Sequence, residues 1–199
     1  MRIVLTGGGT AGHVYPNLAI AELMSRDSKN LEIYYIGSKR GIEADLVKKA
    51  GIIFYCVSTG KLRRYFDLRN FLDFFKVPMG VMQSLNLLHK IKPDLVFSKG
   101  GFVSFPVVFA ANVLGIPIII HESDSMPGLA TKLCARYAKK ILLGYENCEK
   151  YLKEYTGKTE FVGNPIRKEI LCGDKKYGLQ ITGFSGKRPA LLAVGGSGG

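Results

Sequence analysis

The sequence predicts an α/β protein built on a Rossmann-like, doubly wound parallel sheet, and three observations support this. Short apolar runs alternate with stretches of helical period along most of the 199 residues. Some runs, such as Ile118, Ile119 and Ile120, are apolar without a break, as in strands that helices cover on both faces. Glycine-rich loops directly follow two of these runs, at the position where a loop connects a strand to the next helix in doubly wound sheets.

The apolar runs define the expected elements. Strands are expected at residues 2–6, 32–36, 52–57, 95–98, 118–121, 140–143 and 160–162. Helices are expected at residues 16–26, 43–50 and 104–114. Pro16 suits a first helical turn because it lacks an N–H group, and Gly51 and Gly115 suit the ends of the next two helices.

Composition divides the chain into three parts. Residues 1–163 carry the alternation of strands and helices and are expected to form one domain. Residues 164–188 are rich in glycine, lysine and polar side chains, which is typical of a linker. Residues 189–199 join an apolar run, 190–194, to a glycine cluster. Because a strand followed by a glycine loop is how a nucleotide-binding domain begins, we expect a second domain cut off at its first loop.

The net charge of +12 points to an anionic partner. Nucleic acid, an anionic lipid surface and a phosphorylated substrate all fit, and so does a merely basic surface. Nucleic acid is not expected, because no binding motif is recognised and the aromatic residues cluster with leucine and methionine. No apolar run approaches the roughly 18 residues of a membrane-spanning helix. The four cysteines are far apart and form no CxxC pair, which favours free thiols over a metal site.

Residues 61–92 interrupt the alternation. They hold seven lysines or arginines against two aspartates, together with many phenylalanines and leucines. A loop followed by one or two helices is expected, whose aromatic residues either join the core or form a basic, apolar patch that rests on an anionic membrane. The candidate membrane patch comprises Lys61, Arg63, Arg64, Phe66, Phe71, Phe74 and Phe75.

Glycine loops follow the strands at 2–6 and 95–98, and a third cluster ends the chain. The first loop fits GxGxxG loosely, but it lacks the Gly-Lys-Ser/Thr of a phosphate-binding P-loop. Residues 36–40 contain no carboxylate, which weighs against a nicotinamide-binding fold. Two such loops at one edge of a sheet favour a cleft for phosphate-bearing ligands.

Three polar side chains beside these loops are candidates for chemistry. His13 follows the first loop and could remove a proton from a hydroxyl group, or it could simply cap its helix. His121 and Glu122 follow the most apolar strand of the chain. They could line a site, or this turn could serve only to cap the next helix through Asp124 or Ser125.

Six stretches occur in the order and at the spacing of one enzyme family: GGGTAGHVYPNLAIA, GIEADLVKKAGI, KGGFVSFP, HESDSMPGLATK, VGNPIR and VGGSGG. With them the chain resembles the MurG family of N-acetylglucosaminyltransferases over essentially its whole length. The resemblance implies the N-terminal half of a GT-B fold, in which two Rossmann-like domains face a cleft. It also implies an inverting transfer of N-acetylglucosamine from UDP-N-acetylglucosamine to the 4-hydroxyl of a muramyl-pentapeptide on undecaprenyl pyrophosphate, without metal or cofactor. The N-terminal domain of the family binds this acceptor at the cytoplasmic face of the bacterial membrane.

The resemblance also implies a role for each matching residue. His13 becomes the candidate general base, and Glu122 joins it in the catalytic group. The donor-binding residues are Thr10, Ala11, Gly12, Asp124, Arg167 and Ser197. The residues that hold the acceptor pyrophosphate are Gly8, Gly9, Gly100, Gly101, Phe102, Ser104 and His121.

Two positions depart from the family pattern. Ala11 replaces a glycine, which is tolerable only if its φ stays negative. Asp124 replaces an asparagine and adds charge near a pyrophosphate. A related transferase with another lipid-linked acceptor, or a non-catalytic acceptor-binding subunit that docks on the membrane, therefore stays open. Because the donor-binding half is missing, this chain alone is expected to be inactive.

Overall fold

A computed structural model describes residues 1–28, 30–39, 41–60 and 69–193 of the chain. The strands are β1 (Arg2–Thr6), β2 (Glu32–Ser38), β3 (Ile53–Val57), β4 (Leu95–Ser98), β5 (Ile118–Glu122), β6 (Lys140–Leu143) and β7 (Thr159–Phe161). The α-helices are α1 (Ala11–Asp27), α2 (Glu43–Lys49), α3 (Arg69–Ile91), α4 (Ser104–Val113), α5 (Leu129–Ala135), α6 (Lys168–Leu171) and α7 (Lys175–Thr182). Two 3₁₀ helices, Glu146–Tyr151 and Lys153–Lys158, separate β6 from β7.

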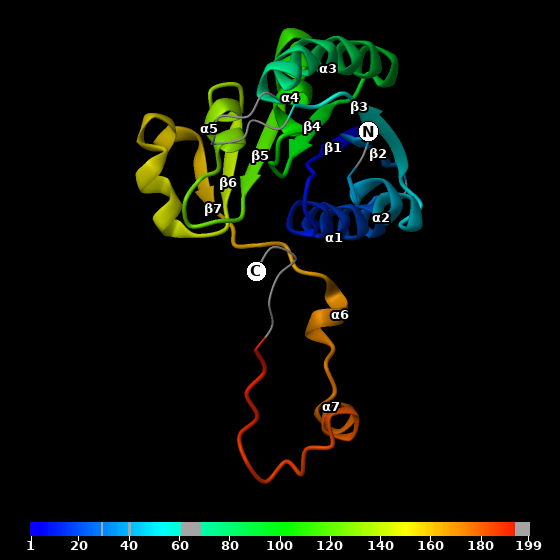
Figure 1. The fold of residues 1–199 in the computed structure, drawn as a ribbon, viewed down its shortest axis with the longest axis vertical. Coiled ribbons are helices and arrows are strands. Elements are labelled where there is room, and N and C mark those ends of the chain that lie inside the picture. The colour runs from blue at the N-terminus through cyan, green and yellow to red at the C-terminus, as the bar shows by residue number, and fades with distance from the viewer. Residues whose placement is uncertain (29, 40, 61–68, 194–199) are drawn as a thin grey trace.

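The strands form one parallel sheet of order β3-β2-β1-β4-β5-β6-β7. Helices cover both faces, with α1 and α2 on one and α3, α4 and α5 on the other (Figure 1). Alternation along β1 explains this, since Val4 packs with the α3 and α4 side while Ile3 and Leu5 pack with α1 and α2. The predicted doubly wound parallel sheet is confirmed, and its strand order reverses between β1 and β4.

Helix α1 starts earlier than expected. It begins at Ala11, immediately after the first glycine loop, and carries Pro16 inside it. The predicted start at Pro16 is wrong because a proline near a helix start costs one hydrogen bond and does not prevent the preceding turn from forming. Ala11 lies in this first turn and is not among the residues with positive φ, so its methyl group is tolerated.

The basic stretch contributes one long helix. Helix α3 runs from Arg69 through Pro78 and packs against α4. Three phenylalanines of the candidate membrane patch, Phe71, Phe74 and Phe75, fall in its first turns. The patch residues Lys61, Arg63, Arg64 and Phe66 lie outside the described residues. No helix within the described ranges is long and apolar enough to cross a bilayer.

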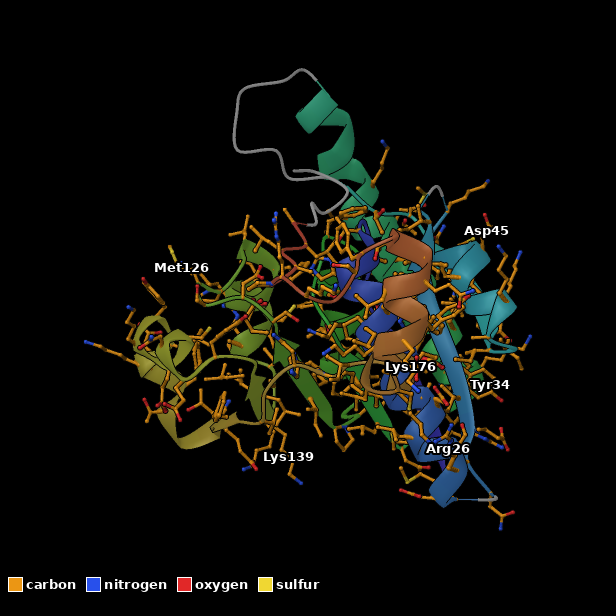
Figure 2. The ribbon with its side chains drawn as sticks, turned by 90° about the horizontal axis from the view of Figure 1, so that it is seen from below. Arg26, Tyr34, Asp45, Met126, Lys139 and Lys176 are labelled. Atoms are coloured by element: carbon orange, nitrogen blue, oxygen red, sulfur yellow. The ribbon has the colours of Figure 1, made fainter. Side chains whose placement is uncertain are left out.

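The segment after β7 leaves the sheet (Figure 1). The expected linker contains α6 and α7, and Asp174 caps α7 by accepting a hydrogen bond from the Tyr177 N–H group at 2.7 Å. Viewed from below, Lys176 of α7 lies in front of α1, and Met126 and Asp45 lie at opposite ends of the view (Figure 2), while Figure 1 shows that α7 itself lies well away from the sheet. The strand expected at 190–194 is not formed over its described residues, where Leu191 is 94% exposed, because no neighbouring strand is there to pair with it.

Candidate functional site

The candidate site lies at the carboxyl edge of β1, β4 and β5. The loop after β1 carries Thr10 and His13, the loop after β4 carries Lys99 to Phe102, and the turn after β5 carries His121 to Asp124. These three connections flank the point where the strand order reverses, which is where open α/β sheets bind their ligands. The sequence-predicted residues from both glycine loops and from the HESD turn therefore come together at one edge.

The two glycine loops pack directly on each other. Gly101 has φ +82°, and a Cβ atom there would collide with the carbonyl oxygen of Gly8. Gly9 has φ +92°, and its Cα faces the ring of Phe102. These glycines thus permit one loop to approach the other, whereas the sequence suggested that they permit a ligand to approach. Gly12 is different, because the space beside its Cα is open apart from the Thr10 hydroxyl.

A buried carboxylate supports the first loop from behind. Glu43, at the start of α2, is fully buried and its Oε1 accepts hydrogen bonds from the N–H group (2.8 Å) and the hydroxyl (2.5 Å) of Ser38. The same carboxylate faces Gly8, where no Cβ would fit. Its Oε2 has no hydrogen-bond partner among the described atoms. The GIEADLVKKAGI stretch marked this region in the sequence, but an acidic residue in a first helical turn gave no sign of burial.

His13 is half-buried at the start of α1 and faces the second loop. Its Nδ1 lies 2.8 Å from the hydroxyl oxygen of Thr10, which stands at the N-cap position. A Cβ at Gly100 would stand 3.6 Å from its Nε2, so this ring edge is turned toward the second loop. Burial, and next the positive charge of Lys99, lower the pKa of His13 below its usual value. The imidazole is therefore held neutral at pH 7 and can accept a proton.

The HESD turn is held together by its own polar atoms. Oε1 of Glu122 accepts the Asp124 N–H group at 3.0 Å, and Oε2 accepts the Gly128 N–H group at 3.0 Å and the Thr131 hydroxyl at 2.5 Å. Glu122 is only 7% exposed, so this geometry fits a residue that orders the turn. The N-cap of α5 is Gly128, so the capping alternative that named Asp124 or Ser125 is wrong. Asp124 itself is exposed.

His121 is 1% exposed and contacts the segment after β7. Its Nε2 lies 2.9 Å from the carbonyl oxygen of Gly163, so Nε2 carries the proton and donates. Its Nδ1 is buried without a partner among the described atoms. Burial, and next the charge of Lys99, lower the pKa of His121 to about 4.

The VGNPIR stretch fastens this segment to the site. Asn164 donates from Nδ2 to the carbonyl oxygen of Ser123 at 3.1 Å. This hydrogen bond is next to the one from His121 Nε2 to the carbonyl oxygen of Gly163. The guanidinium carbon of Arg167 lies 4.4 Å from the ring centre of Tyr15, over α1. Asn164 was missed in the sequence, where only the match of the stretch to a family pattern could have marked it.

Polar contacts hold the second loop in place, one within the loop and one to the HESD turn. The Ser104 hydroxyl, which is buried, donates to the carbonyl oxygen of Gly100 at 2.7 Å. Lys99 is 2% exposed and its Nζ contacts the hydroxyl oxygen of Ser123. Lys99 was not predicted as a site residue, because a lysine beside glycines usually faces solvent. Ser197 lies outside the part of the chain that the structure describes.

The N-terminus of α1 also lies at this carboxyl edge of the sheet. This helix of 17 residues has no acidic residue in its first turn, and the side chain of Thr10 does not cap it. Its free N–H groups and its positive dipole end remain available to an anion. Within the described ranges, no three histidine, cysteine, aspartate or glutamate side chains gather as they would to hold a metal ion. The arrangement can therefore place a neutral imidazole beside an anion-binding helix end.

Known proteins are similar to this chain over its whole length. A transferase of Lachnospira eligens, named UDP-N-acetylglucosamine–N-acetylmuramyl-(pentapeptide) pyrophosphoryl-undecaprenol N-acetylglucosamine transferase, is 52% identical over 198 residues, which is 100% of this chain and 55% of that protein. The chain thus spans about half the length of the curated relatives it matches.

Among solved structures, MurG of Acinetobacter baumannii superimposes with a TM-score of 0.67 at 24% identity, over 84% of this chain and 46% of that one. The UDP-GlcNAc 2-epimerase of Neisseria meningitidis, bound to UDP-GlcNAc, superimposes with a TM-score of 0.60 at 14% identity, over 82% and 46%. Both likenesses concern the fold. The profile of the glycosyltransferase family 28 N-terminal domain matches residues 3–143. The chain belongs to glycosyltransferase family 28 and carries the N-terminal domain of that family.

Proposed function

We propose that this chain is the acceptor-binding half of an enzyme that transfers N-acetylglucosamine from UDP-N-acetylglucosamine to a lipid-linked N-acetylmuramyl-(pentapeptide) pyrophosphate. The observation that carries the proposal is the neutral His13 imidazole, held by Thr10 between the two glycine loops at the point where the strand order reverses. Membership of family 28 and the name of a relative at 52% identity supply the substrates.

The proposed reaction begins at the acceptor hydroxyl. Its oxygen forms a bond with C1 of the donor sugar while the bond from C1 to the UDP oxygen breaks, and the hydroxyl proton passes to Nε2 of His13. For this, Nδ1 must carry a proton and donate it to the Thr10 oxygen, which lies 2.8 Å away. The N–H groups at the start of α1 and the two loops would stabilise the acceptor pyrophosphate.

The remaining roles follow the same scheme. Glu122 would order the turn that lines the acceptor side, since three donors already occupy its carboxylate. We propose that Thr10, Gly12 and Asp124 face the donor sugar, and that Arg167 reaches the donor phosphates after leaving the ring of Tyr15. Ser197 would join them from a second domain that residues 164–188 connect to this one.

The test is a transfer assay on the full-length protein with UDP-N-acetylglucosamine and lipid I. Formation of the disaccharide-linked lipid supports the proposal, and its absence with a folded protein contradicts it. UDP-glucose serves as the matched donor control. Lipid I without its sugar 4-hydroxyl serves as the acceptor control, because it cannot be glycosylated at that position. Transfer to a different lipid-linked sugar would identify a related transferase and would correct the acceptor.

We further propose that the chain works at the cytoplasmic face of the bacterial membrane as a peripheral protein, through the basic, phenylalanine-rich patch of residues 61–75. The net charge of +12 supports attraction to anionic lipid. Co-sedimentation with vesicles should increase with the content of anionic lipid and fall when Lys61, Arg63 and Arg64 are replaced by glutamine. Binding that ignores both changes would contradict the electrostatic attraction.

A further inference from the structure

Among the residues whose burial the structure describes, Lys99 is the one lysine or arginine with a buried side chain, at 2% exposure. Its backbone N–H group donates to the carbonyl oxygen of Thr6 at 2.9 Å, which fixes the start of the second loop against the end of β1. Burying an ammonium group costs free energy unless nearby groups compensate for its lost hydration. The position of Lys99 therefore needs a reason beyond packing.

The compensating groups belong to the HESD turn. The Nζ atom donates to the hydroxyl oxygen of Ser123, and the charges of Glu122 and Asp124 attract the ammonium group. Burial outweighs this attraction and lowers the pKa of Lys99 to about 8, so the side chain is still mostly charged at pH 7. Lys99 thus brings a positive charge from the second loop to a turn that carries two carboxylates.

The same charge acts on the first loop. Glu122, Asp124 and Glu43 all favour the protonated form of His13, whereas Lys99 opposes it. Burial is the largest cause of the lowered pKa of His13, and Lys99 adds to it against the attraction of the three carboxylates. A protonated imidazole cannot accept a proton from a hydroxyl group.

We propose that Lys99 is a positioning residue that sets the charge beside His13, because its buried ammonium group, which contacts the Ser123 hydroxyl, balances the carboxylates of Glu122 and Asp124. The effect on turnover rests on the function proposed above, whereas the effect on His13 does not. Asp124 is the residue that departs from the family pattern by adding a negative charge, and Lys99 supplies the cation that balances it.

The direct test follows the imidazole titrations by NMR on this chain, which has three histidines. In Lys99→Met the titration midpoint of His13 should move to higher pH, because a repelling charge is lost. In Lys99→Arg, which keeps the charge, the midpoint should stay close to the wild-type value. His89, in the last turn of α3 at the amino edge of β4, is the internal control and should not move.

A second variant, at an exposed residue, keeps the proposal testable if replacing the buried Lys99 prevents folding. Asp124 is exposed, so Asp124→Asn should leave the fold intact, and it should move the His13 midpoint to lower pH because an attracting charge is lost. A His13 midpoint that does not move in either Lys99→Met or Asp124→Asn overturns the proposal. Equal movement in Lys99→Met and Lys99→Arg also overturns it, since that would report repacking and not charge.

The full-length protein adds a kinetic readout. In Lys99→Met the acidic limb of the profile of kcat/KM against pH should move toward higher pH, with about tenfold lower kcat/KM on that limb, and Lys99→Arg should restore it. If the full-length protein transfers no sugar while the His13 midpoint moves as expected, the proposed function fails and the role of Lys99 stands. If transfer occurs and the midpoint does not move, the role of Lys99 fails alone.

Discussion

The two glycine loops look alike in the sequence and differ in the structure. Both leave a central strand and open a helix, α1 or α4. The first loop becomes exposed from Gly9 onward and presents Thr10 and a half-buried His13. The second begins with the buried Lys99 and ends at the buried Ser104. The first loop therefore presents a partly exposed imidazole at the carboxyl edge of the sheet, whereas the second loop is packed behind it.

The largest effect is expected where the loops touch. In Gly101→Ala the new methyl group would meet the Gly8 carbonyl at a φ of +82°, and we expect a loss of ~3 kcal/mol in unfolding free energy. The matched control is Gly12→Ala, where space is open and the residue is helical, and the change there should lie within ~1 kcal/mol. Urea unfolding of both variants measures this. Equal losses would mean that the loops do not depend on their contact.

Replacing His13, the proposed base in the first loop, should leave the fold unchanged. In full-length His13→Ala, turnover should fall by roughly 100-fold or more, the usual result of losing a general base. His89→Ala is the control, because it removes a histidine at the amino edge of the strands. Circular dichroism and a transfer assay check the two statements. Turnover that survives the replacement would leave the first loop without its proposed base.

The fold was largely predictable because strand burial is recorded directly in the sequence. Continuous apolar runs gave β1, β4 and β6 their observed bounds. The strand expected at 190–194 was assigned to a second domain, so it stays a prediction, although residues 190–193 form no strand here. The predicted start of α1 was wrong because Pro16 lies inside the helix and does not begin it.

The site was predictable in position but not in its internal contacts. Strand ends and glycines located both loops and the HESD turn. The burial of Lys99 and Glu43 depends on which loops pack together, and residue type gives the opposite expectation for both. The role of Gly9 and Gly101 in loop packing was hidden for the same reason, since a glycine marks a close approach without naming the partner.

The burial of His121 beside the second loop can be tested through protein stability at different pH values. The pKa of His121 is about 4 in the folded chain against 6.5 ordinarily, so the unfolded chain binds more protons between these values. Stability from this group is present above pH 6.5 and is lost as the pH falls toward 4, by ~2 kcal/mol. Comparing urea unfolding of the wild type and His121→Gln at pH 7 and pH 4.5 isolates this contribution. A pH dependence as steep in the variant as in the wild type would assign it to other groups.

The smallest effect concerns the bond that fastens the segment after β7 to the turn facing both loops. Asn164→Ala removes the 3.1 Å hydrogen bond to the Ser123 carbonyl, and we expect a loss of ~1 kcal/mol in unfolding free energy because the bond is partly exposed to water. Asn30→Ala, at the far edge of the sheet, is the matched control. Amide hydrogen exchange of the Asn164→Ala variant then shows which of the two segments orders the other. Faster exchange confined to residues 121–128 would show that the segment orders the turn, whereas faster exchange confined to residues 164–171 would show that the turn orders the segment.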